Sequence, residues 1–280
     1  MTFGALILAN SAALFGLFLV LYFVSLVRRD ASIVDIAWGP AFVLVAWIGL
    51  LAGGAPGPRP AIVTALVTLW GVRLGLHLFL RSRGRGEDLR YRAMREAHGA
   101  RFAWVSLFTV FLLQAALVLV ISTPVTLIAS RSADTATLEA SAMGASLSWL
   151  DAMAAILMIS GLLIESIADL QLTRFLRDPR SRGRVLDRGL WRYSRHPNYF
   201  GDAVVWWGLG LFGLASGGWI SLLGPSIMTF LLLRVSGVVL LEKTITARRP
   251  AYAEYVARTS AFFPRPRRGR TSASNAARIY

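Results

Sequence analysis

The chain begins with MTFGALILANSAALFGLFLVLYFVSLV (residues 1–27), a run that contains no charged side chain. An α-helix needs about 20 predominantly apolar residues to cross the hydrocarbon core of a bilayer, and this run is long enough. A secretory signal would start with basic residues and end at a small-residue cleavage site, so its pattern differs. We therefore expect a transmembrane helix that stays in the protein.

Further apolar blocks follow along the chain. Of the 280 residues, 55% are hydrophobic and 16% are charged, and the apolar residues form uninterrupted blocks instead of the short periodic runs of a soluble core. The sequence predicts an all-α, polytopic membrane protein with seven transmembrane helices, at residues 3–27, 33–51, 61–80, 103–128, 149–170, 202–215 and 219–241. Since no internal repeat or long linker divides it, we expect one membrane domain over residues 1–263. Residues 264–280 are expected to be a disordered basic tail that anchors to lipid headgroups.

Basic side chains are concentrated in alternate connections between these spans. Two arginines follow the first span, seven lie in residues 81–101, eight in residues 171–201, and nine lysines or arginines from residue 242 onward. Because basic loops stay in the cytoplasm, this alternation predicts an N-terminus outside and a C-terminus inside. Topology then explains the net charge of +15, and we expect a bacterial inner-membrane protein without a nucleic-acid partner.

Cysteine is absent, so the chain can form neither a disulfide framework nor a thiolate metal site. Its three histidines, His77, His98 and His196, are widely separated in the sequence. We expect no bound metal.

Several ionisable side chains fall within the predicted spans, where they are costly and usually face a bundle interior or a wet cavity. They are Asp35, Arg73, His77, Glu165, Asp169, Arg234 and Glu242. On a helix, Arg73 and His77 share one face with Trp70, and Glu165 shares a face with Asp169. One interpretation is two structural ion pairs that lock helices together, for example Asp169 with Arg73 or Arg234. Two carboxylates on one face need further partners, which favours a cavity that holds a polar ligand.

Asp35 lies one turn inside the second predicted span. A carboxylate at this position can complement the helix dipole, or it can act on a substrate. The residues alone leave both interpretations open.

The stretch LWRYSRHPNYFGD (residues 190–202) precedes the sixth predicted span. Pro197 suits the first turn of a helix, whose unpaired amides can bind an anion. Flanking this turn are Arg192, Arg195 and His196, with Tyr193 and Tyr199 able to stack on a ring or base. A helix start at the lipid headgroups also favours Arg, Tyr and Pro, so an anion site and a simple membrane-surface turn both fit.

A second basic loop, RSRGRGEDLRY (residues 81–91), alternates glycine with arginine. Glycine lets the backbone approach a phosphate closely, and arginine supplies forked donors to it. The loop is neither a Walker motif nor a Rossmann fingerprint, because no strand precedes it.

Three segments resemble the steroid 5α-reductase family, in particular its bacterial membrane branch: SRHPNYFGD (194–202), RGRGEDLRY (83–91) and RPAYAEYVARTSAFFP (249–264). The resemblance implies a seven-helix fold in which NADPH lies in a cavity that faces the cytoplasm, while a flat apolar enone enters from the membrane. It implies hydride transfer to the β-carbon of the conjugated ketone, with an acid that polarises the carbonyl. The protein would contribute orientation and electrostatics.

The resemblance also assigns cofactor-binding residues by position. Asn198 and Asp202 would contact the nicotinamide, and Asp169, one turn after Glu165, would lie beside the ribose and pyrophosphate. The phosphates would be held by Arg73, Arg83, Arg85, Arg174, Arg184 and Arg234, and some of these arginines would select NADPH through its 2′-phosphate. The remaining expected cofactor residues are Glu165, Tyr193, Arg195, His196, Tyr199 and Glu242.

The chain departs from the family at the catalytic pair, a glutamate and a tyrosine at the enone oxygen. Asp35 replaces the glutamate, and Trp70 replaces the tyrosine. An indole N–H donates a hydrogen bond but does not readily release its proton, so Asp35 as the acid would have to be neutral in an apolar setting. His77 is a further acid candidate.

Two other functions fit parts of the sequence. The His-Pro-x-Tyr-x-Gly core also resembles isoprenylcysteine methyltransferases, which use S-adenosylmethionine, but that donor carries no phosphate for the loop arginines. A lipid-binding or transport protein with structural ion pairs is the other alternative, although the chain lacks the internal repeats typical of transporters.

Overall fold

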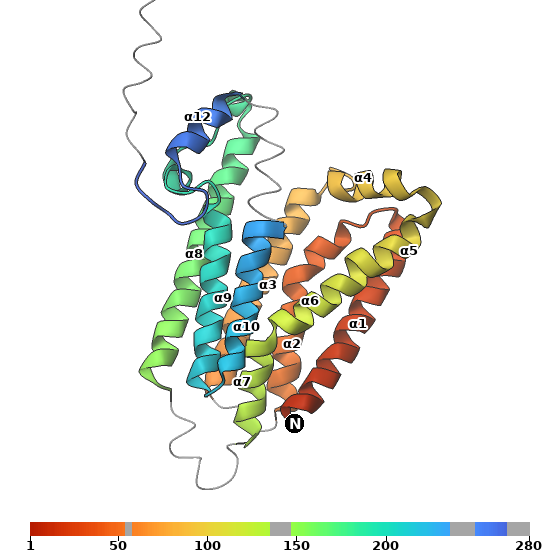
Figure 1. Ribbon diagram of the computed structural model, residues 1–280, viewed down its shortest axis with the longest axis vertical. Coiled ribbons are helices and arrows are strands. Elements are labelled where there is room, and N and C mark those ends of the chain that lie inside the picture. The colour runs from red at the N-terminus through yellow and green to blue at the C-terminus, as the bar shows by residue number, and fades with distance from the viewer. Residues whose placement is uncertain (54–57, 135–146, 236–249, 268–280) are drawn as a thin grey trace, which may run out of the picture. The chain divides into compact units, whose positions relative to one another are not determined.

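A computed structural model describes residues 1–53, 58–134, 147–235 and 250–267 of the protein (Figure 1). The regular secondary structure in these residues is helical, and Ser194 and Ser260 form an isolated parallel bridge. The predicted all-α class is therefore confirmed for this part of the chain. Residues 236–241 of the last predicted span, Glu242, and residues 268–280 of the predicted tail lie outside it.

The chain divides into two compact units, each built from separate stretches of sequence. The first unit comprises Met1–Ala155 and Leu209–Pro225, and the second comprises Ile156–Gly208 and the chain from Ser226 onward. The helices that lie wholly in the first unit are α1 (Phe3–Arg28), α2 (Ile33–Ala52), α3 (Pro58–Ser82), α4 (Leu89–His98), η1 (Gly99–Arg101), α5 (Phe102–Ser106), η2 (Leu107–Leu112), α6 (Leu113–Ile121), α7 (Thr123–Asp134) and η5 (Trp219–Leu222). The helices of the second unit are η3 (Pro179–Ser181), η4 (Gly189–Arg192), η6 (Leu231–Val235) and α12 (Pro250–Arg258), while α8 (Trp149–Arg177), α9 (Pro197–Ala215) and α10 (Leu223–Phe230) contribute to both units.

Five helices in the described residues are long and apolar enough to cross a membrane: Phe3–Arg28, Ile33–Ala52, Pro58–Ser82, Leu89–Ile121 and Trp149–Arg177. They overlap the first five predicted spans, which indicates a membrane-embedded protein. The sixth predicted span lies in α9, and the seventh is described up to Val235 as a shorter apolar helix.

Several helices extend beyond the ends predicted from hydrophobicity. α3 begins at Pro58 instead of residue 61, because proline is tolerated at the first helical positions. α8 continues to Arg177 instead of residue 170, since arginine side chains at a helix end can reach water. α7 continues to Asp134, past the predicted end at residue 128. The apolar pattern marks the part of a helix that meets lipid, and the hydrogen-bonded helix is longer.

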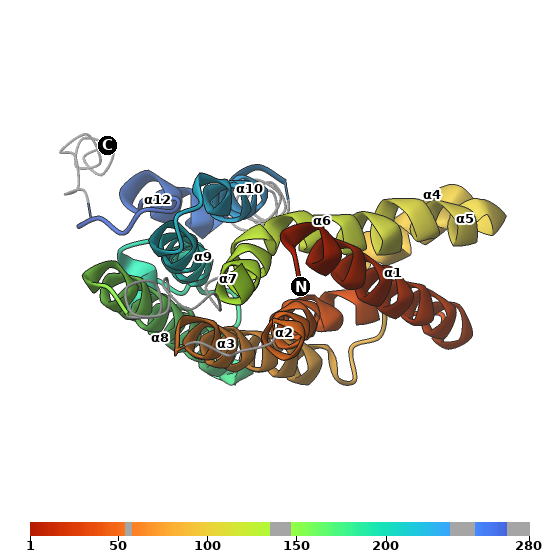
Figure 2. The same cartoon turned by 90° about the horizontal axis from the view of Figure 1, so that it is seen from below.

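In the first unit, α2 packs between α1 and α3 (Figure 2). Glycines let α2 and α3 approach closely: a Cβ added at Gly39 would lie 2.4 Å from the carbonyl oxygen of Gly71, and one added at Gly71 would lie 2.6 Å from the oxygen of Gly39. Helices in lipid associate through such close packing, because apolar burial gives no advantage there. Glycine is therefore required on both sides of this crossing.

A buried ion pair joins the starts of α3 and α8 within the first unit. Arg59 Nε and Nη2 donate to the two carboxylate oxygens of Asp151 at 2.6 and 2.9 Å. Ser148 donates to Asp151 Oδ2 through its amide at 2.7 Å and its hydroxyl at 2.8 Å. Arg59, which the sequence placed in a loop, thus belongs to the first turn of α3 and holds that helix to α8.

The second unit contains a comparable glycine crossing between α8 and α9. A Cβ added at Gly161 would lie 2.6 Å from the carbonyl oxygen of Gly201, and one added at Gly201 would lie 2.6 Å from the amide nitrogen of Glu165. The backbones are in contact at this point. The crossing therefore places Glu165 directly beside the first turns of α9.

We predict that Gly39→Ala destabilises the protein by about 1–3 kcal/mol, the usual cost of forcing a methyl group into a filled site. Thermal unfolding in detergent measures the effect. Gly16→Ala in α1 is the matched control, because no atom outside its own helix lies within 4 Å of the added Cβ. Equal melting temperatures for the two variants would contradict the backbone contact between α2 and α3.

Candidate functional site

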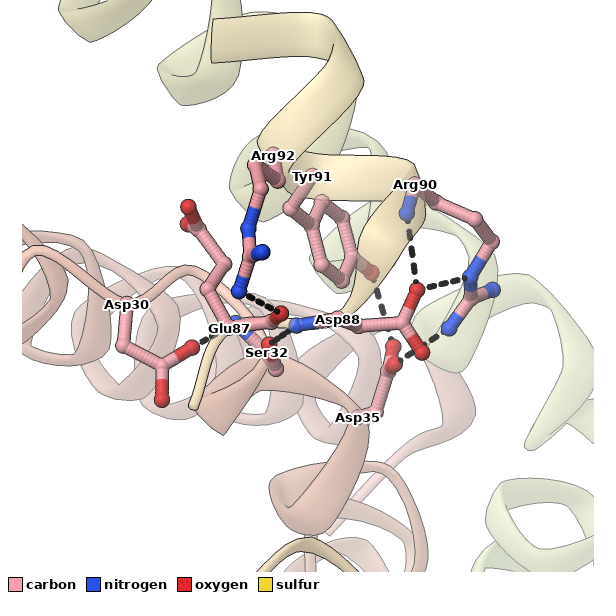
Figure 3. A network of polar contacts seen from close by, with 8 residues as sticks. All are labelled: Asp30, Ser32, Asp35, Glu87, Asp88, Arg90, Tyr91 and Arg92. Carbon is pink, nitrogen blue, oxygen red and sulfur yellow. Dashed lines mark hydrogen bonds and ion pairs between the residues drawn. The ribbon is translucent and has the colours of Figure 1, made fainter. Parts of the chain in front are cut away.

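Two stretches of the first unit that lie far apart in the sequence meet through polar contacts (Figure 3). One is the turn between α1 and α2 with the first turn of α2, and the other is the start of α4 with the residues before it. We call this set of side chains the α2–α4 network; it comprises Asp30, Ser32, Asp35, Glu87, Asp88, Arg90, Tyr91, Arg92 and Arg95. The helix α4 runs across the ends of α1 and α2 instead of along them (Figure 1).

The network begins with backbone amides that lie just before α2 and just before α4 and that the helices themselves do not satisfy. Glu87 Oε1 accepts a hydrogen bond from Ala31 N at 2.9 Å, and Ser32 Oγ accepts one from Asp88 N at 2.7 Å. Asp30 Oδ1 accepts from Ser32 N at 2.9 Å. The acidic pair at the end of the basic loop therefore docks that loop onto the start of α2.

Asp35 receives two donors from α4. Tyr91 Oη donates to Asp35 Oδ1 at 2.8 Å, and Arg90 Nη2 donates to Asp35 Oδ2 at 2.7 Å. Arg90 Nε also donates to Asp88 Oδ1 at 2.9 Å, and its guanidinium carbon lies 5.3 Å from the centroid of the Tyr91 ring. The carboxyl group of Asp35 is therefore held by a cation and a phenol.

Tyr91 is the residue of this network that sequence reasoning missed as a catalytic candidate. The sequence analysis expects phosphate binding from the loop at residues 81–91 and places Trp70 where the family has its tyrosine. Tyr91 is buried, with 7% of its surface exposed. The signal that could have found it is a tyrosine in a segment that resembles a family with a catalytic tyrosine.

Glu87 ties the network to the rest of α4. Arg95 Nη2 and Nε donate to its two carboxylate oxygens at 2.7 and 3.0 Å, and the Arg95 guanidinium carbon lies 4.1 Å from the centroid of the Phe102 ring. Burial raises the pKa of Glu87, but the hydrogen bonds from Arg95 and from the Ala31 amide outweigh it, so the pKa lies below its usual value. Glu87 is thus ionised at neutral pH.

The basic loop that precedes the network keeps its arginines exposed. Arg83 and Arg85 alternate with Gly84 and Gly86, whose φ angles of 77° and 69° are left-handed. Arg85 N donates to Ser82 O at 3.0 Å and closes a turn. Exposed guanidinium groups on such a turn can donate bidentate hydrogen bonds to phosphate oxygens, as the sequence analysis expects.

On α3, Trp70, Arg73 and His77 follow one another at helical spacing. Trp70 is 2% exposed and meets the Phe42 ring edge-on, with 5.8 Å between centroids. Arg73 and His77 are partly buried. The indole at the position of the family's tyrosine therefore belongs to the packed interface between α2 and α3.

The second unit gathers most of the predicted cofactor residues that are buried. Glu165, Asp169, His196 and Asp202 are all buried, and the first two lie on α8 next to the start of α9. We call these side chains, together with Asn198 and Tyr199, the α8–α9 cluster.

Contacts within this cluster link the two helices. Asn198 Nδ2 donates to Asp169 Oδ1 at 3.1 Å. Asn198 Oδ1 is buried and has no hydrogen-bond partner in the described residues. The His196 and Tyr199 rings are stacked, with 5.6 Å between centroids and planes 3° apart. The cluster therefore presents an amide acceptor beside carboxylates and a flat aromatic pair.

The remaining residues predicted to bind the cofactor in this part of the chain lie outside the α8–α9 cluster. Four are exposed in the second unit: Arg174, Arg184, Tyr193 and Arg234. Arg195 is buried and donates to backbone carbonyls at the end of α12. Glu242 lies outside the described residues.

A family model described as "protein of unknown function (DUF1295)" matches residues 21–259. The chain belongs to this family. The DUF1295 match contains the whole α2–α4 network and the whole α8–α9 cluster, and it ends at Thr259, directly after α12. No curated protein and no solved structure matches the chain.

We predict that Glu87→Gln lowers stability by about 1–3 kcal/mol at pH 7, the cost of losing a charged hydrogen-bond acceptor. The pKa of Glu87 is depressed on folding, so its contribution is complete above the unfolded pKa of about 4.3 and is lost as the pH falls through the lower folded value. Thermal unfolding from pH 7 to 3 should show the gap between wild type and variant closing below about pH 4.3. A gap that stays constant would contradict the ion pair.

Proposed function

We propose that this DUF1295 protein is an NADPH-dependent reductase that saturates the carbon–carbon double bond of a conjugated ketone in a lipophilic, steroid-like substrate. The resemblance of three segments to the steroid 5α-reductase family suggests this reaction. The observation that carries the proposal is the α8–α9 cluster, in which carboxylates and a carboxamide are buried inside apolar helices. Such groups are costly in a membrane protein and usually mark a functional site.

We also infer the topology that this function needs. With α9 and the helix from Trp219 onward counted as spans, the chain crosses the membrane seven times, with its N-terminus outside. The arginine-rich segments 81–101 and 171–201 then face the cytoplasm, where dinucleotides are available. An inner bacterial membrane fits this arrangement.

The residues of the α8–α9 cluster fit the nicotinamide half of a dinucleotide. Asn198 Oδ1 is a buried acceptor that suits the N–H of a carboxamide, and the Asp169 carboxylate suits ribose hydroxyls. Exposed Arg174 and Arg184 suit phosphate oxygens. When bound, NADPH would supply the hydride; the protein would bind and orient it.

In the α2–α4 network, Tyr91 and Asp35 suit the ketone oxygen. The phenolic proton of Tyr91 lies in a hydrogen bond to Asp35. A phenol can donate such a proton to a carbonyl oxygen, whereas the indole N–H of Trp70 does not readily release its proton. We assign the polarising hydrogen bond to Tyr91 Oη, whose single proton would turn from Asp35 Oδ1 to the ketone oxygen when the substrate binds, while Arg90 stays on Asp35 Oδ2 and balances the carboxylate charge. Polarising the carbonyl leaves the β-carbon electron-poor, and the α-carbon then takes a proton from water.

We expect the purified protein to bind NADPH at least tenfold more tightly than NADH. Arg184→Ala should reduce this preference about tenfold, because a charged hydrogen bond to the 2′-phosphate contributes roughly 1.5–3 kcal/mol. Fluorescence titration with both dinucleotides measures it. Arg180→Ala, an exposed arginine in the same connection, is the control and should leave the preference unchanged. Binding of S-adenosylmethionine without binding of either dinucleotide would overturn the reductase proposal.

Tyr91→Phe should lower turnover of a lipid enone about 100-fold or more, the usual contribution of a positioned proton donor, while the Kd of NADPH stays within about twofold. NADPH consumption in proteoliposomes measures turnover. Ser32→Ala removes a different contact of the α2–α4 network and controls for simple loosening of α4. Equal losses in the two variants would mean that Tyr91 is structural.

A further inference from the structure

The C-terminal part of the described chain is bound to the segment that leads into α9. The isolated bridge pairs Ser194 with Ser260, and Arg195 N donates to Ser260 O at 2.8 Å. Arg265 N donates to Tyr193 O at 3.0 Å. We call α12 together with residues 259–267 the C-terminal clamp. Although residues 264–267 were predicted to belong to a disordered tail, the clamp includes them.

Arg195 is the charged centre of this contact. Its side chain is buried, and Nη1 donates to the carbonyl oxygens of Val256 at 3.0 Å and Thr259 at 2.6 Å. The last carbonyls of a helix have no partner within it and carry partial negative charge. A buried guanidinium persists only where such acceptors surround it. Arg195 therefore caps α12.

Ser194 carries the contact onward to α9. It is fully buried. Its hydroxyl donates to Phe262 O at 2.8 Å, and Ser194 Oγ in turn accepts a hydrogen bond from His196 N at 3.1 Å. His196 is the last residue before α9, whose first residue, Pro197, has no amide proton to contribute. The direction in which the chain enters α9 thus depends on the clamp.

Tyr255 closes the contact from the side of α12. Its hydroxyl donates to Trp191 O and approaches Ser194 O at 3.3 Å. Its ring is buried. In addition, Arg267 Nη2 donates to Asp187 at its carbonyl and its carboxylate, at 2.6 and 2.9 Å. The clamp therefore holds the whole segment from residue 187 to residue 196.

We propose that the C-terminal clamp orients the first turn of α9, and that Arg195 is a positioning residue that acts on the dinucleotide through His196 and Asn198. This inference rests on the proposed function. It gives the arginine of the Ser-Arg-His-Pro motif a role different from phosphate binding. A ligand of the 2′-phosphate would affect NADPH more than NADH. A ligand of the pyrophosphate, which the two dinucleotides share, would weaken both but would not change hydrogen exchange in the cofactor-free protein. A positioning residue changes the exchange and both affinities.

The test compares Arg195→Ala, Arg195→Lys and the control Arg188→Ala, an exposed arginine of the same segment. Hydrogen exchange over residues 190–201 needs no cofactor. Arg195→Ala should speed exchange of the Arg195 and His196 amides about tenfold or more, because charged hydrogen bonds that hold them are lost. The affinities of Arg195→Ala for NADPH and for NADH should fall by the same factor, about three- to tenfold. Arg195→Lys keeps the charge and can donate to both carbonyls, so it should recover part of the slow exchange and part of the dinucleotide affinity of the wild type.

Each other outcome decides against part of the proposal. Unchanged exchange in Arg195→Ala would overturn the clamp, whatever happens to dinucleotide binding. Weaker binding of NADPH with unchanged binding of NADH would make Arg195 a direct ligand of the 2′-phosphate. Faster exchange in a protein whose wild type binds no dinucleotide would leave the clamp standing and overturn both the cofactor role and the reductase function. If Arg195→Ala does not fold, Tyr255→Phe removes one hydroxyl of the clamp and should change exchange and both affinities in the same direction.

Discussion

The dehydration of ionic groups is the constraint on which the rest of this structure depends. A carboxylate or guanidinium among apolar helices loses its water and needs hydrogen bonds or an opposite charge in return. Asp151 accepts hydrogen bonds from Arg59, and Asp35 accepts them from Arg90 and Tyr91. Asp169 accepts one from the side-chain amide of Asn198. Each of these contacts joins two different helices. The polar side chains therefore also determine which helices are held together.

Glycine brings helix backbones into contact close to two carboxyl-bearing positions. Gly39 follows Asp35 by one turn of α2, and Gly161 precedes Glu165 by one turn of α8. In both units a carboxylate thus lies one turn from a point where two helix backbones touch. Close packing replaces the hydrophobic effect as the force between helices in lipid. In the second unit, the crossing that joins α8 and α9 also places Glu165 beside α9.

The many arginines of this chain divide by what they contact. Arg90 and Arg95 neutralise carboxylates of the α2–α4 network, and Arg195 caps α12. Other arginines are exposed at a helix end or in loops, and among them we expect the phosphate ligands; they are Arg83, Arg85, Arg174 and Arg184. Arginine therefore neutralises carboxylates and caps a helix in the described residues, and the proposed function would add phosphate binding by its exposed copies.

The sequence by itself determined the helical class, the positions of the apolar helices and the candidates for buried charge, because bilayer thickness and the cost of burying ions act on local composition. It pointed to the α8–α9 cluster through charged residues in apolar spans. Only the tertiary structure decided which groups meet. Asp35 accepts hydrogen bonds from Arg90 and Tyr91, which are 55 and 56 residues away in the sequence. Arg195 donates to the carbonyl of Val256, 61 residues away. Such pairings depend on distances and directions that exist only after the helices pack, and no local pattern contains them.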